Sequence, residues 1–234
     1  MPHDAKPLRL VPVRVWDPAV RIFHWAIVIL VGFCWWTAET GRMEWHTKAG
    51  QCALALVVFR ILWGFFGRGT ARFSSFVRGP EAVLEYAARF GKRVASHSVG
   101  HNPMGALSVL ALLAVLALQT WSGMFAIDTD QEYSGPLSNL LSYDGARAAA
   151  ELHEWSFSLI QILVVLHVAV VLFYLVWKRE NLVAAMVSGN ALLPSGTSAP
   201  ALGGMGRAVA LALLSAVLVW LIANYGVRAV LAVT

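Results

Sequence analysis

Five long apolar segments recur along this chain of 234 residues. About 20 apolar residues in helical conformation are enough to cross the hydrocarbon core of a bilayer, which is about 30 Å thick. Backbone polar groups must find their partners within the segment when they lie in lipid, so each segment is expected to be a helix. The segments that reach or approach this length are 20–38, 46–66, 103–125, 151–177 and 207–225. The sequence therefore predicts an all-α transmembrane helical bundle, with a four-helix core and a fifth, C-terminal transmembrane helix.

The composition excludes most other classes of protein. Hydrophobic residues make up 58% of the chain and charged residues 13%, and the mean hydropathy is +0.64, which is far from the composition of soluble domains. The net charge of +5 is dispersed over short connections, so a nucleic-acid partner is not expected. The two cysteines, Cys34 and Cys52, lie within apolar segments and do not predict a disulfide framework.

The connections divide the chain into four parts. We expect a cytoplasmic N-terminal segment at 1–19, a four-helix domain at 20–180, a flexible linker at 181–206 and the additional helix at 207–234. Gly, Pro, Ser and Ala are frequent in the second half of the linker, which is typical of a flexible connection. Asn102 and Pro103 predict the start of the third helix, because Asn caps helix N-termini and Pro fits the first turn.

Charges on the connections predict the orientation of the bundle. Basic residues dominate before the first helix, between the second and third, and after the fourth, and these connections all lie on one side of the membrane. They are Lys6, Arg9, Arg14, Arg21, Arg68, Arg72, Arg78, Arg89, Lys92, Arg93, Lys178 and Arg179. The connections on the other side are mostly acidic, with Asp128, Asp130, Glu132 and Asp144 in the longer one. The positive-inside rule therefore predicts a cytoplasmic N-terminus and an external C-terminus.

Histidines within the predicted spans are the strongest candidates for a functional site, because ionisable residues in membranes are costly. His24 lies near the cytoplasmic end of the first helix, and His46 lies at the outer start of the second. His153 and His167 lie 14 residues apart on the fourth helix, hence on similar faces and about 21 Å apart along its axis. His24 then shares its depth with His167, and His46 shares its depth with His153.

Two histidine pairs at two depths favour two haems. Neutral imidazole is a good axial ligand to iron, and a flat macrocycle fits between apolar helices. No Cys-x-x-Cys-His motif is present in the sequence, so the haems would be non-covalent, b-type and bis-histidine. Zinc is a weaker alternative, because separated pairs without carboxylate or thiolate neighbours do not form a tetrahedral site.

Four further residues are candidates for contacts with these haems. Arg60 lies 14 residues after His46, so it falls at the depth of His24 and could pair with a haem propionate. Arg21 is a second candidate for that role, with snorkelling to headgroups as an equal alternative. Lys48 could serve the outer haem. His101 could contact the inner haem or a quinone.

Several motifs in the chain resemble those of the prokaryotic cytochrome b561 superfamily, which includes the b-type subunits of nickel-iron hydrogenases. The motifs are Val15-Trp16-Asp17-Pro18, Arg21-Ile22-Phe23-His24-Trp25, Gly100-His101-Asn102-Pro103-Met104-Gly105-Ala106, Leu152-His153-Glu154-Trp155 and Leu166-His167. The resemblance covers the first four helices, through Trp177, and does not extend to the fifth. It implies four helices that hold two bis-histidine haems b, and at the matching positions the axial ligands are His24, His46, His153 and His167.

The resemblance also implies a bacterial cytoplasmic membrane protein that passes electrons between the quinone pool and a redox partner. That partner would be a c-type cytochrome or a membrane oxidoreductase subunit, as in a hydrogenase-like complex, and a homodimer is also left open. Whether the chain is a carrier or a component of a quinone-linked oxidoreductase stays undecided. A haem-carrying assembly factor or a membrane scaffold is the alternative from a different class. A transporter is disfavoured, because the spans lack internal carboxylates and paired broken helices.

Overall fold

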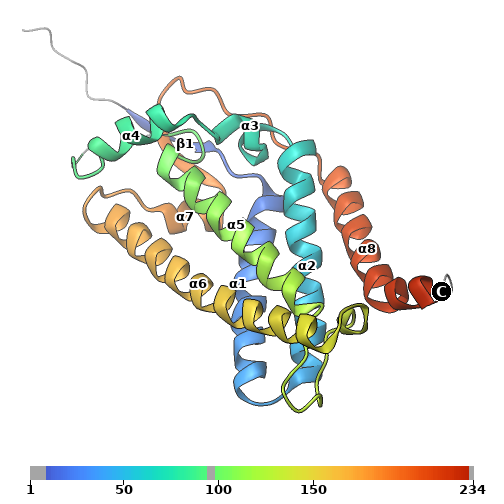
Figure 1. The fold of residues 1–234 in the computed structure, drawn as a ribbon. Helices are drawn as coiled ribbons and strands as arrows, with labels where there is room; N and C mark the ends of the chain where they lie inside the picture. Colours follow the sequence, from blue (N-terminus) through green and yellow to red (C-terminus); the bar gives the residue numbers. More distant parts are fainter. Residues whose placement is uncertain (1–8, 94–97, 232–234) are drawn as a thin grey trace, which may run out of the picture.

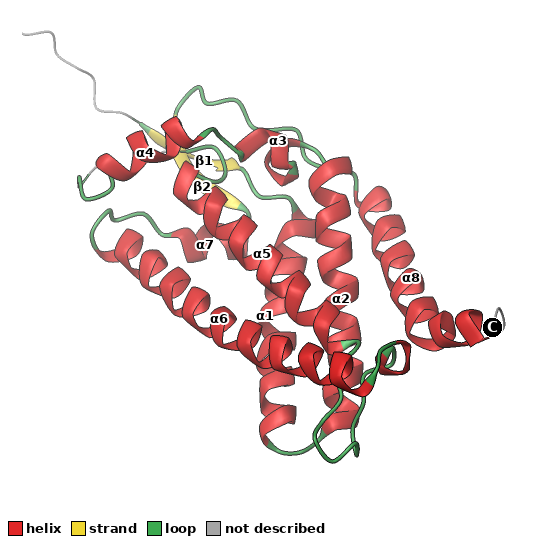
Figure 2. Ribbon diagram, in the orientation of Figure 1, coloured by secondary structure: helices red, strands yellow, loops and turns green. Residues whose placement is uncertain are grey.

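The computed structural model describes residues 9–93 and 98–231, and within these residues the chain is mostly helical. Figure 2 shows one small two-stranded sheet at one end of a group of long helices. The prediction of a transmembrane helical bundle is confirmed, and the sheet is an addition to the all-α prediction. Parts of two predicted segments, residues 1–8 and 232–234, lie outside the described residues.

Five helices of the described chain are long and apolar enough to cross a membrane. They are α1 (Pro18–Glu39), α2 (Met43–Phe66), α5 (Pro103–Gly123), α6 (Tyr143–Val176) and α8 (Met205–Leu231). Figure 1 shows α1, α2, α5 and α6 together, with α8 on the outside against α2. All five segments predicted from hydropathy are therefore helices.

Two of the helix starts follow directly from capping residues. The Asp17 carboxylate accepts a hydrogen bond of 2.8 Å from the backbone N–H of Ala19, and Pro18 occupies the first turn of α1. The Asn102 side chain likewise accepts from the N–H of Gly105 at 2.8 Å, with Pro103 as the first residue of α5. The predicted start of the third membrane helix at Pro103 is confirmed.

Helix α6 begins eight residues earlier than its apolar segment predicted. Ser142 caps it by accepting from the N–H of Gly145 at 3.2 Å, and Asp144 lies in its first turn, where a negative charge is favourable. Its 34 residues correspond to about 50 Å of helix, more than a bilayer core requires. The helix must therefore tilt strongly or extend beyond the hydrocarbon region.

The prediction of a flexible linker at 181–206 is wrong for its first half. That half forms α7 (Leu182–Ser188) and β2 (Asn190–Pro194), and β2 pairs antiparallel with β1 (Leu10–Arg14). Two residues of the sequence favour this regular structure. Asn181 caps α7 by accepting from the N–H of Ala184, and Gly189 adopts φ +90° in the turn between α7 and β2. The sheet joins the N-terminal segment to the chain that leaves α6.

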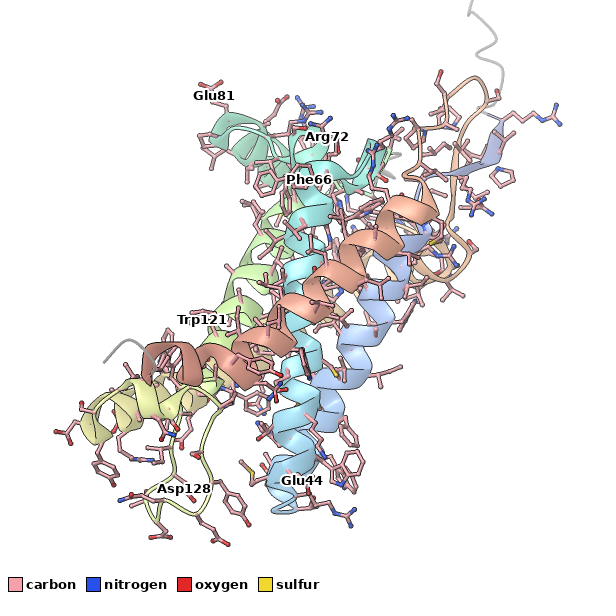
Figure 3. All side chains as sticks on the ribbon, turned by 90° about the vertical axis from the view of Figure 1, so that its right-hand side faces the viewer. Glu44, Phe66, Arg72, Glu81, Trp121 and Asp128 are labelled. Atoms are coloured by element: carbon pink, nitrogen blue, oxygen red, sulfur yellow. The ribbon has the colours of Figure 1, made fainter. Side chains whose placement is uncertain are left out.

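The two ends of the bundle differ in character. One end, which we call the Arg72 end, carries the sheet, α7, the 3₁₀ turn Gly69–Ala71, α3 (Phe73–Phe76) and α4 (Pro80–Ala88). The opposite end, which we call the Asp128 end, carries the short connection near Glu44 and the longer loop with the 3₁₀ turn Ser138–Leu140. Figure 3 labels Arg72 and Glu81 at the first end and Glu44 and Asp128 at the second.

Helix α8 packs along α2 rather than standing apart from the bundle. Ala208, Ser215 and Val219 of α8 are buried, and Ala208 joins a cluster with Phe59 and Trp63 of α2. The chain that enters α8 is fixed at Gly203, whose N–H donates to the Asp17 carboxylate at 2.8 Å. A Cβ at Gly203 would overlap the ring of Trp63, so this crossing requires glycine.

Candidate functional site

The structure brings the four candidate histidines together as two pairs. His24 of α1 and His167 of α6 have ring centroids 6.5 Å apart, and His46 of α2 and His153 of α6 have centroids 6.0 Å apart. These are the pairs predicted from depth. All four rings are half-buried, between helices that hold them from opposite sides.

These separations suit two imidazoles that share one metal ion. With metal–nitrogen bonds of about 2 Å, two imidazoles on opposite sides of an ion have ring centroids about 6.5 Å apart. Helix α1 packs mainly against α2, and α6 packs mainly against α5, so the paired rings face one another between helices that are not in close contact. Within the described residues, no group of three or more His, Cys, Asp or Glu side chains is arranged to hold a metal.

The pair His46–His153 is held in the tautomer that a metal ligand requires. His46 Nδ1 lies 2.9 Å from the carbonyl oxygen of Cys34, and His153 Nδ1 lies 2.8 Å from the carbonyl oxygen of Gln119. A carbonyl oxygen can only accept, so each Nδ1 carries the proton and donates. Each Nε2 then presents a lone pair, and the carbonyls of Cys34 and Gln119 fix the orientation of both rings.

Glycine shapes the position of His153. A Cβ at Gly123, the last residue of α5, would lie 2.7 Å from His153 Cε1 and 2.9 Å from Nδ1. These distances are shorter than real Cβ contacts, so the imidazole can rest against α5 only because this residue has no side chain. Gly123, Gln119 and Ser156 were not predicted from the sequence. The sequence marks them only as small or polar residues within otherwise apolar helices. The mean hydropathy of a whole segment does not reveal such single residues.

Arg60 and His101 lie near the pair His24–His167 and carry buried polar atoms without partners among the described residues. Arg60 is 2% exposed; its Nη1 donates to the Ala71 carbonyl at 3.3 Å, and its Nη2 has no partner. His101 is wedged between the rings of Trp16 and Phe76, each at 4.7 Å, and its Nδ1 also has no partner.

Electrostatics link His101 to the same region. Burial, and to a smaller extent the charges of Arg60 and His167, lower the pKa of His101 to about 3. His101 is therefore neutral at physiological pH. Buried polar groups are normally satisfied, so the open positions on Arg60 and His101 suit a polar or anionic group such as a haem propionate.

The other two predicted contacts lie elsewhere. The Arg21 guanidinium donates to the carbonyls of Met186, at 3.2 Å, and Val187. These carbonyls lie at the C-terminal end of α7, where a positive charge is stabilising. Lys48 forms an exposed ion pair of 2.5 Å with Glu44 at the Asp128 end. The structure gives each of these residues an acceptor close by in the protein, and a contact of either with a haem stays a prediction.

The donor set therefore fits two planar metallocofactors, each held by two histidines. Comparison with known proteins gave one result: a family model described as prokaryotic cytochrome b561 matches residues 15–189, most of the chain. The match includes all four histidines, Arg60, His101 and Gln119, and it ends before α8. Neither the search of curated proteins nor the search of solved structures gave a match.

Proposed function

The chain belongs to the prokaryotic cytochrome b561 family, a family of membrane b-type haem electron-transfer proteins, and from this premise we propose that it binds two bis-histidine haems b. His24 and His167 would hold one haem, and His46 and His153 the other. The single observation that carries the proposal is the facing of these two pairs at 6.5 Å and 6.0 Å. Each bound haem supplies one-electron chemistry at its iron.

The protein's own residues favour electron transfer over reactions at an open metal position. If two histidines hold each haem, as proposed, they would leave no position on the iron for oxygen or another small ligand. The carbonyls of Cys34 and Gln119 hold two of the ligands in the correct tautomer. The 14-residue spacing of His153 and His167 places these two ligands about 21 Å apart along α6, so the two haems that they would hold would lie at different depths.

The orientation follows from the basic connections. The N-terminus would face the cytoplasm of a bacterium with the Arg72 end inside, and the C-terminus and the Asp128 end would face the periplasm. The haem at His46–His153 would then be the outer one. Electrons would cross the bilayer between a quinone and a redox partner, with the quinone as the lipid-soluble reactant that the family resemblance implies.

Acidic residues beside the outer pair favour a basic c-type cytochrome as that partner. Asp130, Glu132 and Asp144 are exposed, and Asp128 is half-buried where the loop closes. The Asp128 carboxylate accepts from the N–H of Tyr133 at 3.2 Å, and the negative charge of Glu132 raises the pKa of that tyrosine. A field of this sign steers cationic partners to the surface. A membrane oxidoreductase subunit, as in a hydrogenase-like complex, is the rival partner.

The haem assignment is tested with the purified protein. We expect two haems b per chain from the pyridine haemochrome assay and two components in a redox titration. His24→Ala and His167→Ala should remove the same component, and His46→Ala and His153→Ala the other. A variant pair that removed different components would contradict the pairing. Haems that fail to cycle between oxidation states would instead favour an assembly or scaffold protein.

The docking proposal is tested by the rate of electron exchange with a small basic c-type cytochrome at several ionic strengths. Neutralising Asp128, Asp130, Glu132 and Asp144 together should slow the reaction and flatten its salt dependence. Neutralising Glu81 and Glu85 on α4, at the opposite end, is the matched control and should change neither quantity. An unchanged rate in the four-residue variant would exclude docking at this loop.

A further inference from the structure

Both ring nitrogens of His153 contact Gln119, and Nδ1 also lies 3.4 Å from the hydroxyl of Ser122. The main-chain carbonyl of Gln119 lies 2.8 Å from Nδ1, and the side-chain amide nitrogen of Gln119 lies 3.0 Å from Nε2. Gln119 belongs to α5, and His153 belongs to α6. A single glutamine therefore reaches both the nitrogen that sets the tautomer and the nitrogen that would ligate iron.

The chemistry of these atoms assigns the direction of each hydrogen bond. Nδ1 faces a carbonyl and must be protonated, so Nε2 carries a lone pair and needs a donor. The amide nitrogen of Gln119 is such a donor. Its amide oxygen then points the other way, where it accepts from the hydroxyl of Ser156, a fully buried residue of α6. Ser156 thus holds the amide in the orientation that places its nitrogen against His153.

The imidazole itself has little freedom to avoid this contact. Gly123 lies one helical turn after Gln119 on α5, and the ring of His153 rests directly on it. Nδ1 is held by a backbone carbonyl, which no side-chain rotation can move. The movable partner in the arrangement is the side chain of Gln119.

We propose that Gln119 is a positioning residue for the outer haem, and that its amide competes with iron for Nε2 of His153. Its carbonyl prepares the histidine for ligation, and its side chain occupies the ligating lone pair whenever the histidine is not bound to iron. Gln119 would have to release Nε2 before His153 could bind iron, and its amide would be placed to donate to Nε2 again once the histidine is free. This inference rests on the proposed haem at His46–His153.

The test is the rate at which the full-length, haem-loaded protein loses its outer haem to an excess of apomyoglobin. The outer component is identified as the one absent in His46→Ala. Gln119→Leu keeps the size of the side chain but removes the donor, so we expect loss about fivefold slower than in wild type, the factor that one ordinary net hydrogen bond represents. Ser156→Ala frees the amide and should slow the loss by a smaller factor.

Gln161→Leu, an exposed glutamine on α6, is the matched control and should lose haem at the wild-type rate. Equal or faster loss in both Gln119→Leu and Ser156→Ala would overturn the role of Gln119. If Gln119→Leu does not fold, Ser156→Ala decides alone. If His46→Ala leaves the haem content and spectrum unchanged, the proposed outer haem fails, and that result is separate from the outcome for Gln119.

Discussion

Substituting Gly123 by alanine tests whether the contact between α5 and His153 sets the geometry of the outer pair. The new Cβ would lie 2.7 Å from Cε1, whereas ordinary contacts begin at 3.4 Å, so the ring must retreat by about 0.7 Å. Retreat from α5 is also retreat from the carbonyl of Gln119. The hydrogen bond of 2.8 Å would then lengthen to about 3.5 Å, beyond the normal range.

The same movement pushes His153 toward His46. Their centroids are 6.0 Å apart, and a shift of about 0.7 Å would reduce this separation to about 5.3 Å, well short of the separation of about 6.5 Å that suits a shared metal. Loss of one net hydrogen bond is worth about 1 kcal/mol, or about a fivefold change in an equilibrium constant. Gly123→Ala should therefore weaken retention of the outer haem at least about fivefold.

The assay is the haem-to-protein ratio by pyridine haemochrome, together with the reduced-minus-oxidised spectrum after prolonged dialysis against apomyoglobin. The inner component should be retained. Gly206→Ala on α8, where nothing lies within 4 Å of the added Cβ, is the matched control and should keep both haems. Full retention of the outer haem with an unchanged spectrum in Gly123→Ala would refute the reasoning.

Three further perturbations test other parts of the structure. Arg60→Met removes a buried positive charge near the inner pair and should lower that haem's midpoint potential by on the order of 50 mV in a redox titration. Lys48→Gln, at an exposed ion pair, is the control and should change both potentials little, and a larger shift in Lys48→Gln than in Arg60→Met would contradict the placement of Arg60. Asp17→Ala removes the acceptor for the N–H groups of Ala19 and Gly203 and should lower the free energy of unfolding by about 2 kcal/mol, measured by thermal unfolding in detergent. Asp130→Ala, at an exposed residue, is the control and should have almost no effect. Equal melting temperatures in the two variants would show that Asp17 does not hold the chain that enters α8. Reporter fusions should be cytoplasmic at Arg89 and periplasmic at Asp130, and the reverse result would exchange the inner and outer assignments of the two pairs.

The sequence alone determined the membrane helices and the pairing of the histidines. Both depend on one-dimensional regularities: the length of an apolar run decides whether a helix can cross a bilayer, and the rise per residue decides the depth of each histidine. The cap at Asn102 and Pro103 is equally local, and it gave the start of α5 correctly.

The tertiary structure decided the features that depend on contacts between distant segments. The sheet between β1 and β2 joins strands about 180 residues apart in sequence, and neither five-residue strand is stable without the other. Arg21 was a candidate for a propionate contact, with snorkelling to headgroups as an equal alternative, and the structure shows acceptors for it at the end of α7. Gln119 and Gly123 of α5 contact His153 of α6, and Ser156 of α6 donates to Gln119. Only the rotation of one helix against the other brings these residues together. Hydropathy records the length of a helix, whereas the direction in which each side chain points from it is fixed by packing.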